Sequence, residues 1–304
     1  MSKKATRRSY GDYLAELGKT HPEIVVLDAD LADATFTKLF KNEYPDRFFD
    51  CGIAEANMMD MAAGLSTMGF TPFVSTFAVF GTGRAYDQIR NGIAYSNFNV
   101  KLAFSHAGIS TGADGGSHQS IEDIALMRVI PGMTVFVPAD DNETRAAMDA
   151  ALEINGPVYI RCARMETNIL PEHPFVAGKA AILRDGRDVA LICCGITVDQ
   201  CIEAAEILEK EGISAAVVNI HTVKPLDNET VLTYANKCRK VITVEDHSVI
   251  GGLGDAVASV ICGNAECKFE KLGVQDRFGQ SATPSELLHE YGIDSETIAA
   301  AAQA

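Results

Sequence analysis

The side chains best suited to chemistry gather in the first half of the chain, most of them close to glycines. They are Arg7, Glu55, Phe77, Phe80, His106, Asp114 and His118. Imidazoles near a carboxylate transfer protons and bind hydroxyl groups. These residue types predict an enzyme that acts on a phosphorylated or polyhydroxylated small molecule.

Arginines provide a means of binding an anionic group on such a substrate. A guanidinium matches a phosphate with two parallel hydrogen bonds. The candidates by residue type are Arg7, Arg84, Arg161 and Arg164. Residue type alone does not choose among them.

Glu55 lies between a short predicted strand, residues 46–50, and a predicted helix, residues 54–68. The apolar residues expected on one face of this helix are Met58, Ala62, Leu65 and Met68. Open α/β sheets present ligand-binding groups at strand-to-helix turns. A carboxylate at the start of a helix also interacts favourably with the helix dipole, so a purely structural role is the alternative.

Strands and helices alternate around these residues. Strands are predicted at 24–28, 46–50, 71–75, 100–106, 134–137 and 158–161, and helices at 9–20, 54–68, 83–96, 121–129 and 143–155. His106 then ends a buried strand, and the glycine-rich residues 108–120 form a long loop beyond it. This alternation is typical of a doubly wound, mainly parallel sheet.

A second α/β pattern follows a proline-bearing stretch at 168–174. It consists of strands at 188–194, 214–219 and 240–245 and helices at 198–212, 227–237 and 252–262. The predicted fold class is α/β, with two three-layer domains of which the second is smaller. We expect a first domain at 1–166, a linker at 167–180 and a second domain at 181–304.

The composition excludes several classes of partner. The formal net charge is -15 and no long basic run is present, which argues against nucleic acid or an anionic membrane. No apolar run is long enough to span a bilayer, and we expect no secretory signal because the first residues are polar. The eight cysteines form no C-x-x-C pair, so we expect reduced thiols, no metal site on this chain and a cytoplasmic location.

Several motifs occur in an order that resembles the transketolases. In the first half they are Gly52-Ile53-Ala54-Glu55, Ser75-Thr76-Phe77-x-x-Phe80 and His106-x5-Gly112-Ala113-Asp114-Gly115-x2-His118-Gln119. In the second half they are Val218-Asn219-x3-Val223-Lys224-Pro225-Leu226 and Glu245-Asp246-His247-Ser248-x2-Gly251-Gly252-Leu253-Gly254. The resemblance covers the pyrimidine-binding domain and the C-terminal domain of that family, and essentially the whole chain.

The resemblance implies roles for the candidate residues around thiamine diphosphate. Glu55 matches the glutamate that hydrogen-bonds the aminopyrimidine ring, and Phe80 the aromatic residue that stacks on this ring, with Phe77 as a second wall. His118 and His106 match groups that bind ketose hydroxyls and assist proton transfer.

The same resemblance assigns roles to the residues that would bind the sugar substrate. Asp114 matches a residue that contacts a substrate hydroxyl. Arg7 and Arg164 match the arginines that bind the sugar phosphate, with Arg161 as a near neighbour that a small alignment slip could exchange for Arg164.

One family motif has no counterpart in the sequence. It is the Gly-Asp-Gly…Asn motif that anchors Mg²⁺ and the diphosphate. The chain therefore resembles the C-terminal subunit of a split transketolase. The implied partner is an N-terminal subunit that carries the diphosphate and Mg²⁺ site, in an assembly of two copies of each chain (α2β2).

The sequence departs from the family pattern at two positions. A pocket tyrosine of typical transketolases falls on Gly83, and Tyr86 is a candidate replacement. A phosphate-contacting serine falls on Ala34, with Thr35 as the adjacent substitute. These changes bear on specificity rather than on the reaction class.

Three alternatives remain beside this resemblance. A 1-deoxyxylulose-5-phosphate synthase shares Arg84-Ala85-Tyr86-Asp87-Gln88 but has Arg where His106 stands. The beta subunit of 2-oxo-acid dehydrogenases has a similar plan but typically lacks the Asp114-to-His118 arrangement. A binding module is the third, because Gly251-Gly252-Leu253-Gly254 follows a predicted strand, although the full G-x-G-x-x-G is missing.

Overall fold

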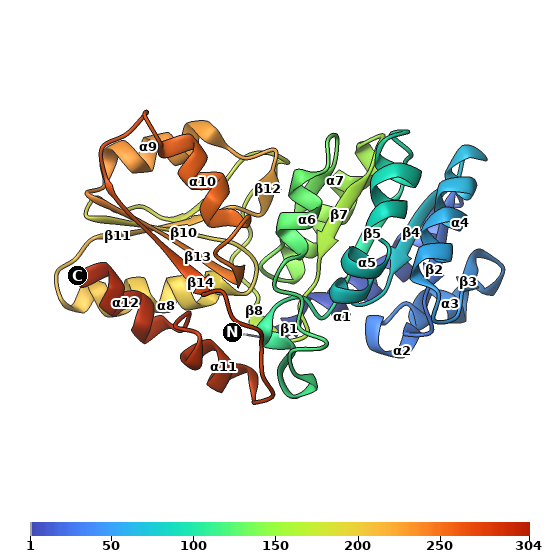
Figure 1. The fold of residues 1–304 in the computed structure, drawn as a ribbon, viewed down its shortest axis with the longest axis horizontal. Coiled ribbons are helices and arrows are strands. Elements are labelled where there is room, and N and C mark those ends of the chain that lie inside the picture. The colour runs from blue at the N-terminus through green and yellow to red at the C-terminus, as the bar shows by residue number, and fades with distance from the viewer. Residues whose placement is uncertain (1) are drawn as a thin grey trace.

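The structure is a computed structural model that describes residues 2–304. Met1, with which the predicted first domain begins, lies outside the described residues. Two mainly parallel sheets stand side by side, each covered by helices on both faces (Figure 1). This arrangement confirms the predicted α/β class with two three-layer domains.

The first sheet has the strand order β12-β6-β7-β5-β4-β2-β3. Its strands are β2 (Ile24–Asp28), β3 (Phe48–Asp50), β4 (Thr71–Ser75), β5 (Lys101–Phe104), β6 (Thr134–Phe136), β7 (Val158–Arg161) and β12 (Thr222–Lys224). All neighbours are parallel except β12, which runs antiparallel to β6. Because β12 comes from the second half of the chain, the second domain completes the edge of the first sheet.

Helices cover this sheet because its strands are apolar on both faces. One face packs on α1 (Thr6–Thr20), α3 (Lys38–Glu43) and α7 (Asp141–Glu153), and the other on α4 (Glu55–Thr67), α5 (Ala78–Arg84), the π-helix η2 (Gln88–Ala94) and α6 (Asp123–Val129). In β2, Val26 belongs to the core beneath α1, whereas Val25 and Leu27 belong to the core beneath α4. Side chains that alternate across a strand produce this division.

Short elements complete the first domain and connect it to the second. They are β1 (Lys3–Ala5), which pairs with β8 (Glu166–Asn168), and α2 (Ala32–Thr35), η1 (Pro45–Arg47) and η3 (Ile109–Asp114). The last of these lies inside the loop predicted at 108–120.

The second sheet has the order β14-β13-β10-β11-β9, and only β9 is antiparallel to its neighbour. Its strands are β9 (Ala181–Arg184), β10 (Val189–Cys193), β11 (Ala215–Asn219), β13 (Lys240–Ser248) and β14 (Lys268–Val274). On one side lie α8 (Thr197–Lys210) and α12 (Ser295–Gln303), and on the other α9 (Asn228–Lys237) and α10 (Leu253–Ile261) (Figure 1). The helix α11 (Pro284–Glu290) contacts η3 of the first domain.

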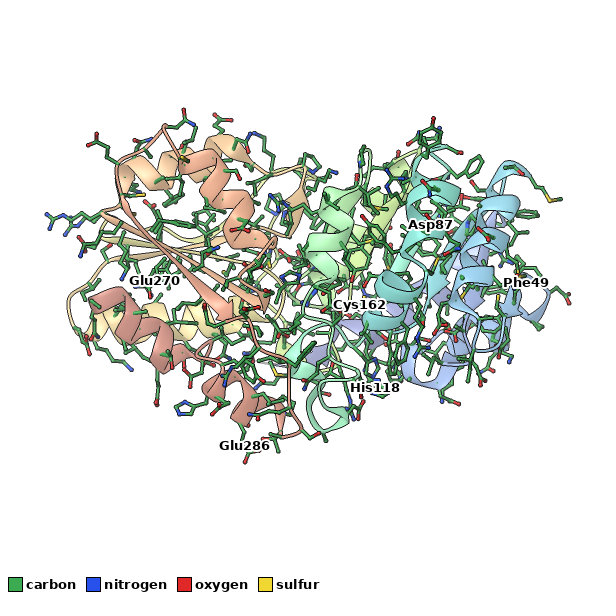
Figure 2. The ribbon with its side chains drawn as sticks, viewed as in Figure 1. Phe49, Asp87, His118, Cys162, Glu270 and Glu286 are labelled. Carbon is green, nitrogen blue, oxygen red and sulfur yellow. The ribbon has the colours of Figure 1, made fainter. Side chains whose placement is uncertain are left out.

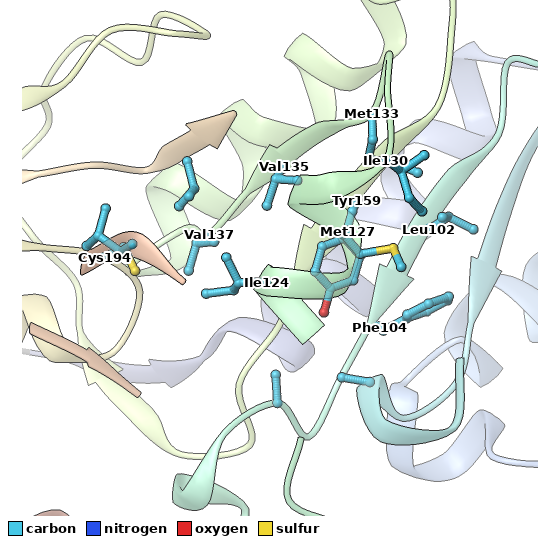
Figure 3. Packing of buried hydrophobic residues seen from close by; sticks show 14 of the residues in the cluster. Leu102, Phe104, Ile124, Met127, Ile130, Met133, Val135, Val137, Tyr159 and Cys194 are labelled. Carbon is cyan, nitrogen blue, oxygen red and sulfur yellow. The ribbon is translucent and has the colours of Figure 1, made fainter. Parts of the chain in front are cut away.

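One hydrophobic core continues from the first domain into the second. Figure 3 shows side chains of β5, α6, β6 and β7 in the same cluster as Cys194, which follows β10. Val137 and Cys194 are both almost fully buried in it. The boundaries placed at 166 and 181 stay a prediction.

Two local predictions about helices are wrong. The helix expected at 83–96 is two elements, because α5 begins at Ala78 and a π-helix follows it. The glycines at 81 and 83 do not favour a helix, so the sequence pattern did not indicate this start. Gly81 is needed because a Cβ there would overlap the ring of Phe104. Met68, expected on the apolar face of the helix at 54–68, is 73% exposed, because α4 ends at Thr67.

Candidate active site

The candidate residues collect at the carboxyl ends of the parallel strands of the first sheet. Glu55 follows β3, Phe77 follows β4, His106 follows β5 and Arg164 follows β7. Ligands bind at this edge in open α/β sheets. Side chains that are distant in the sequence therefore lie at the same edge of the sheet, and their function as one site stays a prediction.

Glu55 is the first residue of α4 and is only 5% exposed. Its Oε1 atom accepts a hydrogen bond of 3.2 Å from the guanidinium of Arg84, which also lies 4.3 Å above the ring of Phe80. Arg84 itself is more than half exposed. The carboxylate is thus buried, whereas the guanidinium that pairs with it is exposed. No sequence pattern indicated this ion pair.

Aromatic rings and imidazoles form a continuous stack beside this carboxylate. The ring of Phe77 lies 5.7 Å from Phe80 at an interplanar angle of 16°, and 3.7 Å from the imidazole of His106. His118 meets Phe80 edge-on at 5.4 Å. Figure 2 places His118 on the loop below α5. A flat heteroaromatic ring is the kind of ligand that such walls bind.

His106 is held in a constrained position at the end of β5. Its φ of 57° is in the left-handed region, which is uncommon for a residue other than glycine. Its Nδ1 atom lies 2.9 Å from the hydroxyl of Ser105, and its Nε2 atom lies 3.4 Å from Arg7. Burial, together with the charges of Arg7 and Arg164, lowers the pKa of His106 to about 3. The imidazole is therefore neutral at neutral pH.

Arg7 turns inward from the first turn of α1. Its NH1 atom donates a 2.8 Å hydrogen bond to the carbonyl oxygen of Ala34, and its guanidinium lies 5.2 Å from the ring centroid of Phe36. Its Nε atom is buried without a hydrogen-bond partner. Burial and the nearby charge of Arg164 lower the pKa of Arg7. A second cation so close is unfavourable unless an anion comes between them.

Arg164 and Asp114 form an exposed pair across the loop. The guanidinium lies 3.2 Å from the carboxylate of Asp114 and donates a 2.7 Å bond to the carbonyl oxygen of Thr111. Arg7 and Arg164 both line a cleft of ≈ 600 Å³, which residues 281–284 and Glu286 of the second domain also line. Two cations therefore face one open space.

Arg161 is not available to a substrate. Its guanidinium makes two hydrogen bonds, of 2.7 and 3.2 Å, to the carboxylate of Asp123, and a 2.8 Å bond to the carbonyl oxygen of Asp246. Both side chains of the pair are buried. Of the two neighbouring arginines, the geometry thus favours Arg164 as the anion ligand.

The structure shows the surroundings of the substitutes suggested for family residues. The hydroxyl of Thr35 is buried and donates a 2.8 Å hydrogen bond to Asp28, so it does not face the site. Gly83 borders open space, and Tyr86 packs on the hydrophobic core. Arg84 is the side chain that covers Phe80.

The N–H groups where the glycine-rich turn meets α10 are occupied by a side chain of the same protein. The carboxylate of Glu245 accepts hydrogen bonds from the backbone N–H groups of Leu253 and Gly254, at 2.7 and 2.8 Å. These are the first N–H groups of α10, which a nucleotide phosphate would need. The turn is therefore a structural connection.

Comparisons with known proteins identify the family of the chain. Residues 2–169 match the family model for the transketolase pyrimidine-binding domain, and residues 178–298 match that for the transketolase C-terminal domain. The chain belongs to the transketolase family, whose members are transferases that depend on thiamine diphosphate. Within that family it corresponds to the C-terminal section, as two relatives of similar length show.

The first is a Methanocaldococcus jannaschii protein named as a transketolase C-terminal section, 47% identical over 97% of this chain and 94% of its own. The second is the 6-deoxy-6-sulfo-D-fructose transketolase subunit SqwH of Clostridium sp. (strain MSTE9), 43% identical over 97% of this chain and 92% of its own. Human transketolase is 42% identical over 98% of this chain but only 48% of its own.

The solved structures give the same result. A structure described as a split gene transketolase, inactive beta4 tetramer, has a TM-score of 0.88 and 48% identity, and the match covers 98% of this chain and 97% of that one. The transketolase of Campylobacter jejuni has a TM-score of 0.84 at 25% identity, with 46% of its chain covered.

Two further observations concern membranes and metals. Across residues 2–304, none of the helices has the length and apolar character needed to cross a bilayer. Within the same residues, no group of three or more His, Cys, Asp or Glu side chains is arranged to hold a metal ion.

Proposed function

We propose that this chain is the C-terminal subunit of a split transketolase that moves a two-carbon ketol unit from a ketose phosphate to an aldose phosphate. The observation that carries the proposal is the buried carboxylate of Glu55 on the same sheet edge as the rings of Phe77 and Phe80. A buried acid beside stacked aromatic rings suits an aminopyrimidine, which offers a ring nitrogen to the acid and a flat face to the rings.

In this proposal Glu55, Phe77 and Phe80 hold the pyrimidine end of thiamine diphosphate. The cofactor, when bound, supplies the nucleophilic carbon that cleaves and re-forms the bond beside the ketose carbonyl. Glu55 shares a proton with the pyrimidine ring, and its burial keeps water from competing for that proton. Since Arg84 lies over Phe80 and pairs with Glu55, a pyrimidine ring stacked on Phe80 would have to displace its half-exposed side chain.

The remaining site residues bind the sugar. His106, neutral and fixed by Ser105, accepts or donates one hydrogen bond, while His118 assists proton transfer at the hydroxyls. Asp114 contacts a hydroxyl group from the rim of the loop. Arg7 and Arg164 bind the phosphate, which supplies the negative charge between the two cations.

The diphosphate and Mg²⁺ belong, in this proposal, to a separate N-terminal subunit. The similar length of the two relatives and the absence of the diphosphate motif from the sequence support this division. We propose two copies of this chain with two partner subunits. The proposed location is the cytoplasm, which agrees with eight free thiols that are mostly packed inside the protein.

Mixing the subunits tests the function. We expect no ketol transfer from this chain alone with thiamine diphosphate, Mg²⁺, a ketose phosphate and an aldose phosphate. Addition of the N-terminal subunit is expected to start the reaction, measured by the aldose phosphate that is released. Full activity of the lone chain would refute the split arrangement, and no activity of the mixture would refute the function.

Arg164→Ala tests the phosphate site in the assembled enzyme. Loss of charge-assisted hydrogen bonds to a phosphate is expected to raise KM about 10- to 100-fold for phosphorylated sugars. KM for unphosphorylated sugars is expected to change far less. Arg8→Ala is the control, because Arg8 pairs with Asp12 on the outer surface of α1. Equal increases for both kinds of sugar would show that Arg164 does not bind phosphate.

A further inference from the structure

Gln119 occupies an unusual position at the end of the loop that carries Asp114 and His118. Its side chain is almost fully buried, at 3% exposure. The Nε2 atom lies 3.1 Å from each of the carbonyl oxygens of Ile109 and Gly112, and 3.0 Å from that of Gln280. The first two oxygens belong to η3, whereas the third belongs to the second domain.

The second domain fits closely around this amide. Gly279 lies so near that a Cβ at this position would overlap the Oε1 atom of Gln119. The segment around Gly279 and Gln280 therefore limits where the amide can go. Only a residue without a side chain allows this approach.

A second contact from the same domain holds the other end of the loop. Asp246, in the last part of β13, is buried and accepts a 2.8 Å hydrogen bond from the backbone N–H of Ile109. Arg161 donates to the carbonyl oxygen of Asp246 at 2.8 Å. The second domain thus contacts the loop both where η3 begins and just after His118.

These contacts lie next to the groups that would meet the substrate. Gln119 directly follows His118, and the acceptor Gly112 lies close before Asp114. Among residues 2–304, the side chain of Asp114 has a partly exposed ion pair with Arg164 as its one salt bridge. The loop therefore depends on its buried contacts for a fixed shape, since exposed ion pairs contribute little rigidity.

We propose that Gln119 is a positioning residue for ketol transfer, whose amide ties the substrate loop to the second domain and thereby fixes Asp114 and His118. This inference rests on the proposed function. A primary amide is required because its two N–H groups face three carbonyl acceptors. A carboxylate in the same place would oppose those acceptors, and a thioether would leave them without a donor.

Gln119→Met tests the tie in the enzyme assembled with the N-terminal subunit, thiamine diphosphate and Mg²⁺. A loop displaced by about 1 Å is expected to lower kcat/KM for the ketose phosphate roughly 10- to 100-fold. Exchange of the thiazolium proton is expected to stay at the wild-type rate, because Glu55 lies on a different strand end. Gly279→Ala, which leaves Gln119 in place but displaces its amide, is expected to give the same pattern.

The control is Gln275→Met, because Gln275 is exposed and directly follows β14; wild-type kinetics are expected. Amide hydrogen exchange of residues 109–118 supplies a readout that needs no turnover, and both test variants are expected to exchange faster there than wild type. Wild-type kcat/KM and wild-type exchange in Gln119→Met would overturn the inference, as would a parallel loss of thiazolium exchange. An inactive wild-type assembly would instead count against the proposed function, and the hydrogen exchange would still report on the tie.

Discussion

Glu55→Gln is expected to remove nearly all ketol transfer from the assembled enzyme, with a loss in kcat of roughly 10²- to 10⁴-fold. The amide keeps the size of the side chain but cannot share a proton with the pyrimidine ring as a carboxyl group does. Because Glu55 is 5% exposed, water has little room to take the place of the missing carboxyl group. Single-turnover measurement of thiazolium proton exchange locates the loss at cofactor activation.

The control for this prediction concerns stability. The partner of Glu55 is the exposed Arg84, so loss of this ion pair is expected to lower the free energy of unfolding by at most about 1 kcal/mol. Glu55→Gln should therefore fold and assemble normally, whereas Glu43→Gln, on the exposed end of α3, should retain full activity. A rate of thiazolium exchange in Glu55→Gln close to that of wild type would rule out the proposed role.

Arg161→Met is expected to lower the free energy of unfolding by about 3–5 kcal/mol. The substitution leaves the carboxylate of Asp123 buried, with the hydroxyl of Tyr159 at 2.6 Å as its remaining side-chain donor. The double variant Arg161→Met/Asp123→Leu removes both charges. It is expected to recover much of the lost free energy of unfolding, because no unpaired charge then remains. Urea titration of each variant measures these differences.

The pH dependence of this effect has a defined sign. Burial raises the pKa of Asp123, but the charge and hydrogen bonds of Arg161 outweigh it and hold that pKa below its usual value. Stabilisation from a lowered pKa is complete above the ordinary value of about 3.9 and is lost as the pH falls through the folded-state pKa. The gap between wild type and Arg161→Met should therefore narrow in acid. A gap that stays constant, or a change no larger than that of the exposed Arg187→Met, would contradict the prediction.

The parallel strands and the residues at their ends were predictable because both depend on local patterns. Apolar runs such as residues 24–28 and the turn before Glu55 specify a strand end without knowledge of the rest of the fold. The shared position of Glu55, Phe77 and His106 then follows from the geometry of a parallel sheet.

Contacts between distant segments could not be predicted in this way. The choice between Arg161 and Arg164 depended on Asp123 and Asp246, which no spacing connects to either arginine. The approach of Arg84 to Glu55 and the tie of Gln119 to Gln280 likewise join separate segments. A short strand such as β12 also lacks a pattern of its own, because its partner β6 defines it.

The antiparallel edge strand β12 limits how this protein can be divided. It pairs with β6 through Thr222 opposite Phe136 and Lys224 opposite Val135, although it lies far beyond the predicted linker. A fragment that ends near residue 180 would expose the backbone of β6 as an open edge that invites aggregation. Gene truncations and chimeras that exchange the second half between relatives should therefore carry residues 222–224 from the same parent as residues 134–136.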